Sequence, residues 1–512
     1  MKIDRESNDG HNRPGGPDQP PWAVAAGAAS LRVTALGLYA LAFGAFLGVA
    51  IVKFGNPVIL DQKIPPPTSL QEVWTYAWPP HWAFWLLVPL ALIGVGMGVG
   101  LNARWRSSRW LWILPATWLG WQFISATQTV DRQLTVVTLC HFAGCVACYF
   151  LGALALGSRR ALQWLLIGVV AAFAFCLVRA VNQRLFEFPQ ERQLLVEGER
   201  LGWTNYAPEV FLEMKREGVI IATNGVDVAN PAILAKYGKA PPPGTDKFQR
   251  LRYSLFATGP RVMGTLVYPN ALAGAILLLL PISLLLAVNS TRRFRLATRA
   301  CAIALTLFLG GAGLFWTGSK LGWLVAMAVV GVWLLRLDWP MYWKRTALVL
   351  VIIGGLALFA IRFHGYFAAG ATSAGARFDY WRAAVQTARE HPFTGTGPGT
   401  FQHPYSDLKS PEAEMARLTH NDYLEQFSDS GIVGGVSYAV WIALSLAVVG
   451  RRLWRSEDPL PFAALIGLLG WFVQGLGEFS LYIPALAWTA FTLLGWLVTV
   501  SGNQIDKPRV PR

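Results

Sequence analysis

The sequence predicts an all-α, polytopic helical membrane protein with about twelve transmembrane helices and two long loops on the outer side of the membrane. Hydrophobic residues make up 54% of the 512 residues and charged residues only 14%, whereas a soluble domain carries about 25% charged residues. The apolar residues form blocks of about twenty, the length at which a helix crosses a bilayer. Basic residues gather in alternate short loops. These observations argue against a water-soluble domain, a collagenous chain and a disulfide framework.

The apolar blocks define the expected spans. They cover residues 31–52, 81–101, 110–126, 134–157, 161–180, 269–289, 300–316, 320–336, 346–361, 430–450, 460–476 and 484–501. The stretch before the first block mixes both charge signs with Gly and Pro, so we expect a retained first span rather than a signal peptide. Because the number of spans is even, both termini are expected on the same side of the membrane.

The positive charges give the expected orientation. Alternate short loops carry clusters of Lys and Arg, at residues 104–109, 159–160, 292–299, 336–345 and 451–455. Such clusters stay in the cytoplasm, so both the N- and C-termini are predicted to be cytoplasmic. The same bias accounts for the formal net charge of +15. No basic stripe alternates with aromatic residues in a soluble segment, and we therefore expect no nucleic acid partner.

The spans divide the chain into seven segments. These are a disordered cytoplasmic tail (1–30), N-terminal helices (31–180), a long outer loop (181–268), central helices (269–361), a second outer loop (362–429), C-terminal helices (430–501) and a cytoplasmic tail (502–512). Within the second loop, Phe378, Trp381, Val385 and Ala388 recur at helical spacing. This pattern predicts an interfacial helix that Pro392 ends.

The most informative motifs lie in and around the second outer loop. They read Arg377-x-x-x-Trp381, Pro392-x-x-Gly395-x-Gly397-x-Gly399-x-Phe401 and His420-Asn421-x-Tyr423-Leu424, with Arg261-x-x-Gly264-Thr265-x-x-x-Pro269-Asn270 and Thr317-Gly318-Ser319-Lys320 upstream. In this order, these elements resemble the signature of the O-antigen ligase and polymerase superfamily of bacterial membrane glycosyltransferases. The sequence departs from the usual pattern at Lys320, where arginine is common, and at Leu321, where glycine is common.

The resemblance implies an enzyme of the bacterial inner membrane whose long loops are periplasmic. It implies metal-independent transfer, without a cofactor, of a glycan from a polyprenyl-diphosphate carrier to a hydroxyl group. The acceptors known in the family are lipid A–core, a protein and the growing polysaccharide. Ligation, polymerisation and protein glycosylation are therefore all open, and the expected partners are the lipid-linked glycan donor, the hydroxyl acceptor and the bilayer.

The expected chemistry needs cations at the outer boundary. Breaking the bond between a sugar and a diphosphate leaves a doubly charged group, which Arg or Lys side chains stabilise best in a site of lowered dielectric. Arg261, Lys320 and Arg377 all fall at the predicted outer boundary. We predict that these three residues bind the diphosphate. The alternative is that each simply extends to the lipid headgroups.

The acceptor hydroxyl needs a base or an oriented hydrogen-bond acceptor, and an imidazole suits that role at neutral pH. His420 is the main candidate, with His403 and His391 as alternatives. We expect Asn421 and Tyr423 to position the loop rather than to react. Glu478, in the turn between the last two spans, is expected to orient His420, to bind sugar hydroxyls or to cap a helix end.

Other interpretations fit parts of the same sequence, and one of them, an inactive scaffold for a glycan-assembly complex, is supported only by the departure at Lys320. A multispanning solute or lipid transporter without chemistry has the same hydropathy, but no inverted repeat or matching pair of Gly/Pro-broken spans is evident. Cys145 and Cys148 form a C-x-x-C motif near His141. A second pair of ligands is missing, so we expect no metal there and assign these side chains to the core.

Overall fold

The computed structural model describes residues 21–100, 110–157, 159–193, 220–223, 226–229, 260–368, 372–410 and 413–503. These residues are helical except for turns and one antiparallel hairpin of β1 (Ile220–Thr223) and β2 (Val226–Ala229). Most of the two expected terminal tails and most of the first expected outer loop lie outside the described residues.

The first half of the chain forms five long helices and several short ones. They are α1 (Pro21–Lys53), η1 (Val58–Lys63), α2 (Leu70–Thr75), α3 (Pro80–Gly100), α4 (Trp110–Ser125), η2 (Ala126–Gln128), α5 (Arg132–Leu154), α6 (Arg159–Asn182) and η3 (Gln183–Glu187). The second half contains α11 (Pro269–Ser290), α12 (Leu296–Thr317), α13 (Lys320–Arg336), α14 (Met341–Ala368), α15 (Thr372–Glu390), α16 (Gln402–Leu408), α17 (Asp422–Leu453), α18 (Pro459–Gln474), η5 (Ser480–Tyr482) and α19 (Pro484–Asn503).

A helix lies at each of the expected spans, and in the described part of the chain nine are long and apolar enough to cross a membrane. The other three, α4, α13 and α18, have 16, 17 and 16 residues. Helices of this length are at the lower limit for crossing a bilayer. The structure thus supports a polytopic helical protein, and a total of twelve spans stays a prediction.

Several boundaries differ from those expected. Helix α1 begins at Pro21, so residues 21–30 are helical rather than part of a disordered tail. This segment is rich in alanine, the best helix former, and begins with a proline, which the first turn of a helix tolerates. Helix α17 begins at Asp422, where the Asn421 side chain caps it, and is interrupted by a kink at Gly431, whose φ of 66° is not helical. The second part of α17 therefore starts close to the span expected from residue 430.

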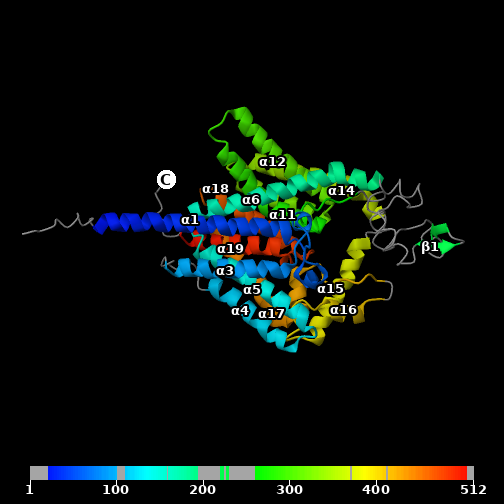
Figure 1. Cartoon of the computed structure of the whole chain (residues 1–512). Helices are drawn as coiled ribbons and strands as arrows, with labels where there is room; N and C mark the ends of the chain where they lie inside the picture. Colours follow the sequence, from blue (N-terminus) through cyan, green and yellow to red (C-terminus); the bar gives the residue numbers. More distant parts are fainter. Residues whose placement is uncertain are drawn as a thin grey trace, which may run out of the picture.

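Helix α19 lies in the middle of the bundle (Figure 1). Along its span 89% of the residues are buried, compared with 6% in α14, which lies on the surface. Close helix approach depends on small residues. A Cβ at Gly495 would collide with the carbonyl of Tyr149 on α5, and one at Gly168 on α6 would collide with that of Gly44 on α1. Such small-residue contacts are typical of helix packing in membranes.

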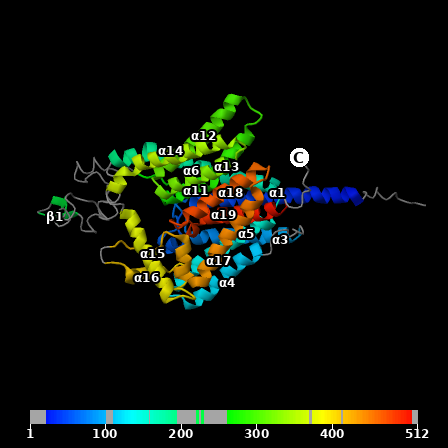
Figure 2. The same ribbon diagram turned by 180° about the vertical axis from the view of Figure 1, so that it is seen from behind.

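The ends of α1 and α19 show how the bundle is oriented. The backbone N–H of Ala485, at the start of α19, donates to the carbonyl of Phe54, just after α1. The start of α1 and the end of α19 therefore lie at the opposite end of the bundle. Helices α15 and α16 cover the end where α1 finishes, as both views show (Figures 1 and 2). Arg377, on α15, and Glu478, just before α19, lie at this covered end.

The predicted interfacial helix is present as α15, and it ends at Glu390, two residues before Pro392. Its buried face carries Tyr380, Ala383 and Ala384, which pack with α16. Phe378 and Val385, from the predicted apolar stripe, point outward and are exposed. The helix therefore has two apolar faces, one against the protein and one free.

Candidate functional site

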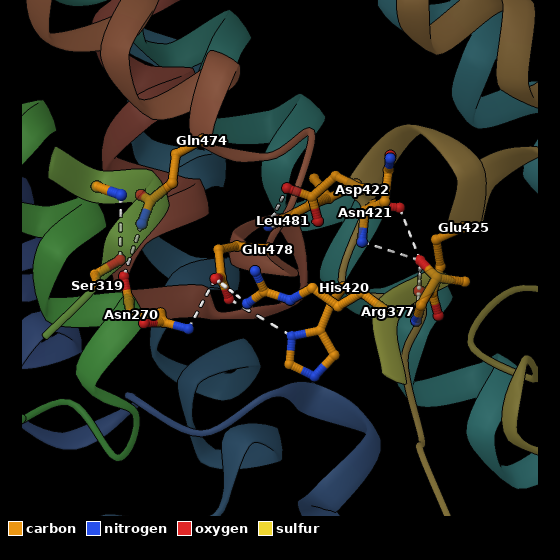
Figure 3. Close-up of polar contacts among 12 residues, drawn as sticks. Asn270, Ser319, Arg377, His420, Asn421, Asp422, Glu425, Gln474, Glu478 and Leu481 are labelled. Atoms are coloured by element: carbon orange, nitrogen blue, oxygen red, sulfur yellow. Dashed lines mark hydrogen bonds and ion pairs between the residues drawn. The ribbon is translucent and has the colours of Figure 1, made fainter. Parts of the chain in front are cut away.

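The polar residues at the covered end converge on Glu478, in the turn between α18 and α19 (Figure 3). This side chain is only 3% exposed. Its Oε1 accepts hydrogen bonds from Arg377 Nη2 at 2.5 Å and from Asn270 Nδ2 at 2.7 Å, and its Oε2 lies 3.6 Å from His420 Nδ1. Burial alone would raise the pKa of Glu478, but His420, Arg377 and Asn270 outweigh it and hold the pKa below its ordinary value. Glu478 is therefore ionised at neutral pH.

Asn270 extends this network to Arg261. Arg261 donates from Nη2 to Asn270 Oδ1 and from Nε to the carbonyl of Thr317, both at 2.5 Å. Burial, together with the positive charges of Arg377 and Arg362, lowers the pKa of Arg261, against the attraction of Glu478. An arginine titrates so far above neutrality that it stays charged. Two predicted cations are thus linked to one carboxylate.

His420 has an unusual backbone conformation. It is the one non-glycine residue in the described part of the chain with a positive φ, at 53°. Such strain costs about 1 kcal/mol or more and is found preferentially at functional sites. The preceding residue is firmly held, because Glu425 Oε2 accepts the backbone N–H of Thr419 at 2.6 Å and its hydroxyl at 2.7 Å. The backbone thus carries the His420 ring toward Glu478.

The ring of His420 lies between two aromatic side chains. Tyr380 stacks on it at 5.9 Å between centroids, and Phe479 contacts it edge-on at 4.7 Å. Nδ1 faces Glu478, and the second ring nitrogen points away from it (Figure 3). The side chain is 31% exposed, so an approaching molecule has access to part of the ring. This arrangement fixes the ring orientation while leaving one nitrogen for another partner.

Asp422 joins the histidine loop to the turn that carries Glu478. Both of its carboxylate oxygens accept the backbone N–H of Leu481 at 3.1 Å. Its own backbone N–H donates to the carbonyls of Gly475, at 2.8 Å, and Glu478, at 3.2 Å. Asp422 therefore bonds to residues before and after Glu478. These bonds hold the loop of His420 directly against the turn of Glu478.

Lys320 is held in a different way. It is the first residue of α13, and its Nζ lies 3.6 Å from the centroid of the Tyr366 ring and 5.4 Å from that of Phe363. The charges of Arg261, Arg377 and Glu478 all act on it. The structure thus brings the three predicted cations into one electrostatic cluster. Lys320 has no ion pair with a carboxylate among the described residues.

The remaining predicted residues have structural contacts. Asn421 Oδ1 accepts the backbone N–H groups of Tyr423 and Leu424 and caps α17, and the Tyr423 hydroxyl donates to the carbonyl of Phe472. Among the alternative histidines, His403 Nε2 pairs with Asp131 at 2.9 Å, and His391 is exposed at the end of α15. None of these contacts involves Glu478.

The glycine-rich turn and the C-x-x-C motif also have packing partners. The backbone N–H of Gly399 donates to Asp429 Oδ2 at 2.7 Å, and its φ of 79° favours glycine. The Sγ of Cys145 lies 3.6 Å from His141 Nε2, inside the bundle. Across the described ranges, no group of three His, Cys, Asp or Glu side chains is arranged to hold a metal ion.

Arg362 and Asn270 are two members of the cluster that were not among the predicted site residues. Arg362 lies near the end of α14, and its charge acts on both Arg261 and Lys320. The available signal was a lone arginine at the end of an apolar run, at the end predicted to face outward, and a similar signal pointed to Lys320. Asn270 carries no charge, and its role depends on a contact with Glu478, 208 positions away.

Residues 305–439 match the family model described as O-antigen ligase. The match runs from within α12 into α17 and includes Lys320, Arg377 and His420, whereas Arg261 and Glu478 join them only through the fold. No curated protein matches the chain. The family match agrees with the motifs and with a bundle of apolar helices, and it supports the likeness of this chain to the O-antigen ligase-like superfamily of membrane proteins.

Proposed function

We propose that this protein is a glycosyltransferase that moves a glycan from a polyprenyl-diphosphate carrier to an acceptor hydroxyl, at the periplasmic face of the inner membrane. The acceptor is lipid A–core, a protein or a growing polysaccharide. In the reaction, the acceptor oxygen forms a bond to the anomeric carbon while the bond from that carbon to the diphosphate oxygen breaks. The lipid diphosphate leaves with the electron pair, and the acceptor proton passes to His420.

The single observation that carries this proposal is the orientation of the His420 ring. An ionised Glu478 beside Nδ1 favours the tautomer that has its proton on Nδ1, which leaves the lone pair of Nε2 free to accept a proton. The 3.6 Å separation of Nδ1 and Oε2 is longer than a hydrogen bond. Contacts of this kind commonly shorten when substrate binds. In this proposal Glu478 is a positioning residue for His420.

The charge balance of the site supports a diphosphate as the leaving group. Arg261, Lys320 and Arg377 surround one carboxylate, that of Glu478. Positive charge therefore exceeds negative charge at the place where a leaving diphosphate develops charge. Cations fixed in a site of low dielectric stabilise such charge without having to reorganise. We infer that these three residues face the diphosphate and that the acceptor approaches from the His420 side.

The test is a turnover assay on the purified protein in lipid nanodiscs, with a polyprenyl-diphosphate oligosaccharide and candidate acceptors, in the presence and absence of chelator. We expect wild type to transfer glycan in chelator and His420→Ala to lose a factor of about 10² to 10⁴ in kcat. His391→Ala, which changes an exposed histidine at the end of α15, is the control and should transfer like wild type.

Each outcome of this assay has a clear meaning. The acceptor that gains sugar distinguishes ligation, polymerisation and protein glycosylation. Transfer that persists in His420→Ala would refute the role of this residue. Carrier binding without transfer to any acceptor would instead favour a transporter.

A further inference from the structure

Two cations of the cluster are held by aromatic rings instead of by carboxylates. Lys320 Nζ and Arg362 Cζ each lie 5.4 Å from the centroid of Phe363. Lys320 also lies over Tyr366, and Arg362 over Phe315, 5.0 Å from its centroid. Phe363 is 4% exposed. The buried Phe363 ring is therefore an aromatic partner of both cations. A cation on an aromatic face is held in place but keeps its full charge.

The other two cations already donate hydrogen bonds to the protein. Arg377 is paired with Glu478, and Arg261 donates to both Asn270 and the Thr317 carbonyl. These side chains are therefore committed to the protein. Their hydrogen bonds must be shared or broken before either guanidinium can bind a ligand through the same nitrogen atoms.

Arg362 has no such partner in the described part of the chain. Its Nε is buried without a hydrogen bond, and it forms no ion pair there. Arg362 lies on α14, a helix in which only 6% of the span residues are buried. A charged side chain that lacks a partner is costly in this setting, and in membrane proteins it marks a functional position. Its charge adds to those of Arg261 and Lys320.

We propose that Arg362 and Lys320, which both lie against the Phe363 ring, form the direct binding site for the diphosphate of the glycan donor. This inference rests on the proposed function and assigns to it a residue, Arg362, that the motifs do not include. The guanidinium of Arg362 can form two parallel hydrogen bonds to phosphate oxygens, while the ammonium of Lys320 acts as a point charge. Arg261 and Arg377 then face the diphosphate as fixed charges, while the hydrogen bonds that they already make hold Asn270 and Glu478.

The proposal is tested by binding of farnesyl diphosphate, a short lipid diphosphate, to the full-length protein in phosphatidylcholine nanodiscs. Titration calorimetry gives the Kd for wild type, Arg362→Gln, Arg362→Lys and the control Arg345→Gln. Arg345 is exposed at the other end of the same helix, so its replacement makes the same change in charge. A charged hydrogen bond typically contributes about 1.5–3 kcal/mol, and we expect Arg362→Gln to raise Kd about tenfold to a hundredfold.

Further arms identify what is recognised. Farnesyl monophosphate should bind more weakly than the diphosphate and be less affected by Arg362→Gln. Inorganic pyrophosphate should compete with the lipid probe if the diphosphate group, rather than the chain, is recognised. Arg362→Lys should recover part of the affinity. Arg362→Lys also tests the proposal if Arg362→Gln does not fold. Because lysine cannot form the two parallel hydrogen bonds of arginine, the Kd of Arg362→Lys should still be several-fold higher than that of wild type.

The result that would overturn the proposal is an Arg362→Gln variant that binds farnesyl diphosphate as tightly as Arg345→Gln, or a wild type that does not bind it. Failure of the proposed function would look different. A wild-type protein that binds the diphosphate in an Arg362-dependent way but transfers no glycan would refute the glycosyltransferase and leave this binding site in place.

Discussion

The two sides of the Glu478 cluster contain the same kind of charge but hold it differently. On one side, Arg261, Arg377 and Glu478 are joined by hydrogen bonds and an ion pair, with Asn270 between them. On the other side, Lys320 and Arg362 rest on aromatic rings. Charges of the first kind are hydrogen-bonded to the protein and build the site. Charges of the second kind remain available to a ligand. The two sides should therefore respond differently to substitution.

The largest effect on stability is expected for the hydrogen-bonded residues Arg261, Arg377 and Glu478. Arg377→Ala leaves the carboxylate of Glu478, 3% exposed, without its ion-pair partner. Breaking a buried pair in this way typically costs about 3–5 kcal/mol. We expect a large fall in the free energy of unfolding, measured by denaturant titration in detergent, and partial recovery in Arg377→Ala/Glu478→Gln, which removes the orphaned charge.

The matched control for this variant is Arg382→Ala on the same helix. Arg382 is 78% exposed and pairs with Asp379 at 3.4 Å. Exposed pairs contribute about 0–1 kcal/mol. Equal losses of stability in Arg377→Ala and Arg382→Ala would mean that Arg377 and Glu478 do not form a buried network.

The next largest effect is expected for Lys320 and Arg362, the cations that lie on aromatic rings, and it concerns binding rather than stability. Lys320→Gln removes a charge that has no carboxylate partner among the described residues, so the free energy of unfolding should change by less than about 1 kcal/mol. The KM for the lipid-linked donor should rise about tenfold, and Lys320→Arg should retain wild-type KM. A Lys320→Gln variant that loses stability and keeps its KM would reverse the comparison.

A smaller effect is expected from the strained backbone of His420. Its φ of 53° is unfavourable for any residue with a Cβ and favourable for glycine. His420→Gly should therefore be more stable than His420→Ala by about 1 kcal/mol, while neither variant transfers glycan. Thermal unfolding of the two proteins side by side measures this difference. Equal stability would mean that the left-handed conformation is lost in the alanine variant.

The smallest effect is a pH dependence of stability. The pKa of Glu478 is lowered in the folded protein, because burial, which raises it, is outweighed by His420, Arg377 and Asn270. Its stabilising contribution is therefore fully present above the ordinary carboxyl pKa of about 4.3 and is lost as pH falls through the lower folded value. The difference in Tm between wild type and Glu478→Gln should be constant from about pH 8 to 5 and shrink below about pH 4. A difference that already shrinks between pH 7 and 5 would contradict the lowered pKa.

The sequence predicted much of the fold, because apolar blocks and basic loops follow directly from the bilayer. It also pointed to Lys320, a lone cation in a short turn that is predicted to lie on the outer side. It did not predict the contacts that build the site. Arg377 and Glu478 are 101 positions apart, and only packing of α15 beside the last turn joins them. The positive φ of His420 depends on Glu425 and Asn421, and no spacing of residue types shows it.

His420 and Glu478 are proposed to act as one unit, and a double-mutant cycle is the sharpest test of this pairing. Single-turnover rates of glycan transfer from pre-bound donor are measured for wild type, His420→Ala, Glu478→Gln and the double variant. If Glu478 acts only through His420, the double variant transfers no more slowly than His420→Ala alone, because residues that act as a unit are strongly non-additive. Losses that add in full would show that the two residues act independently and would contradict the account.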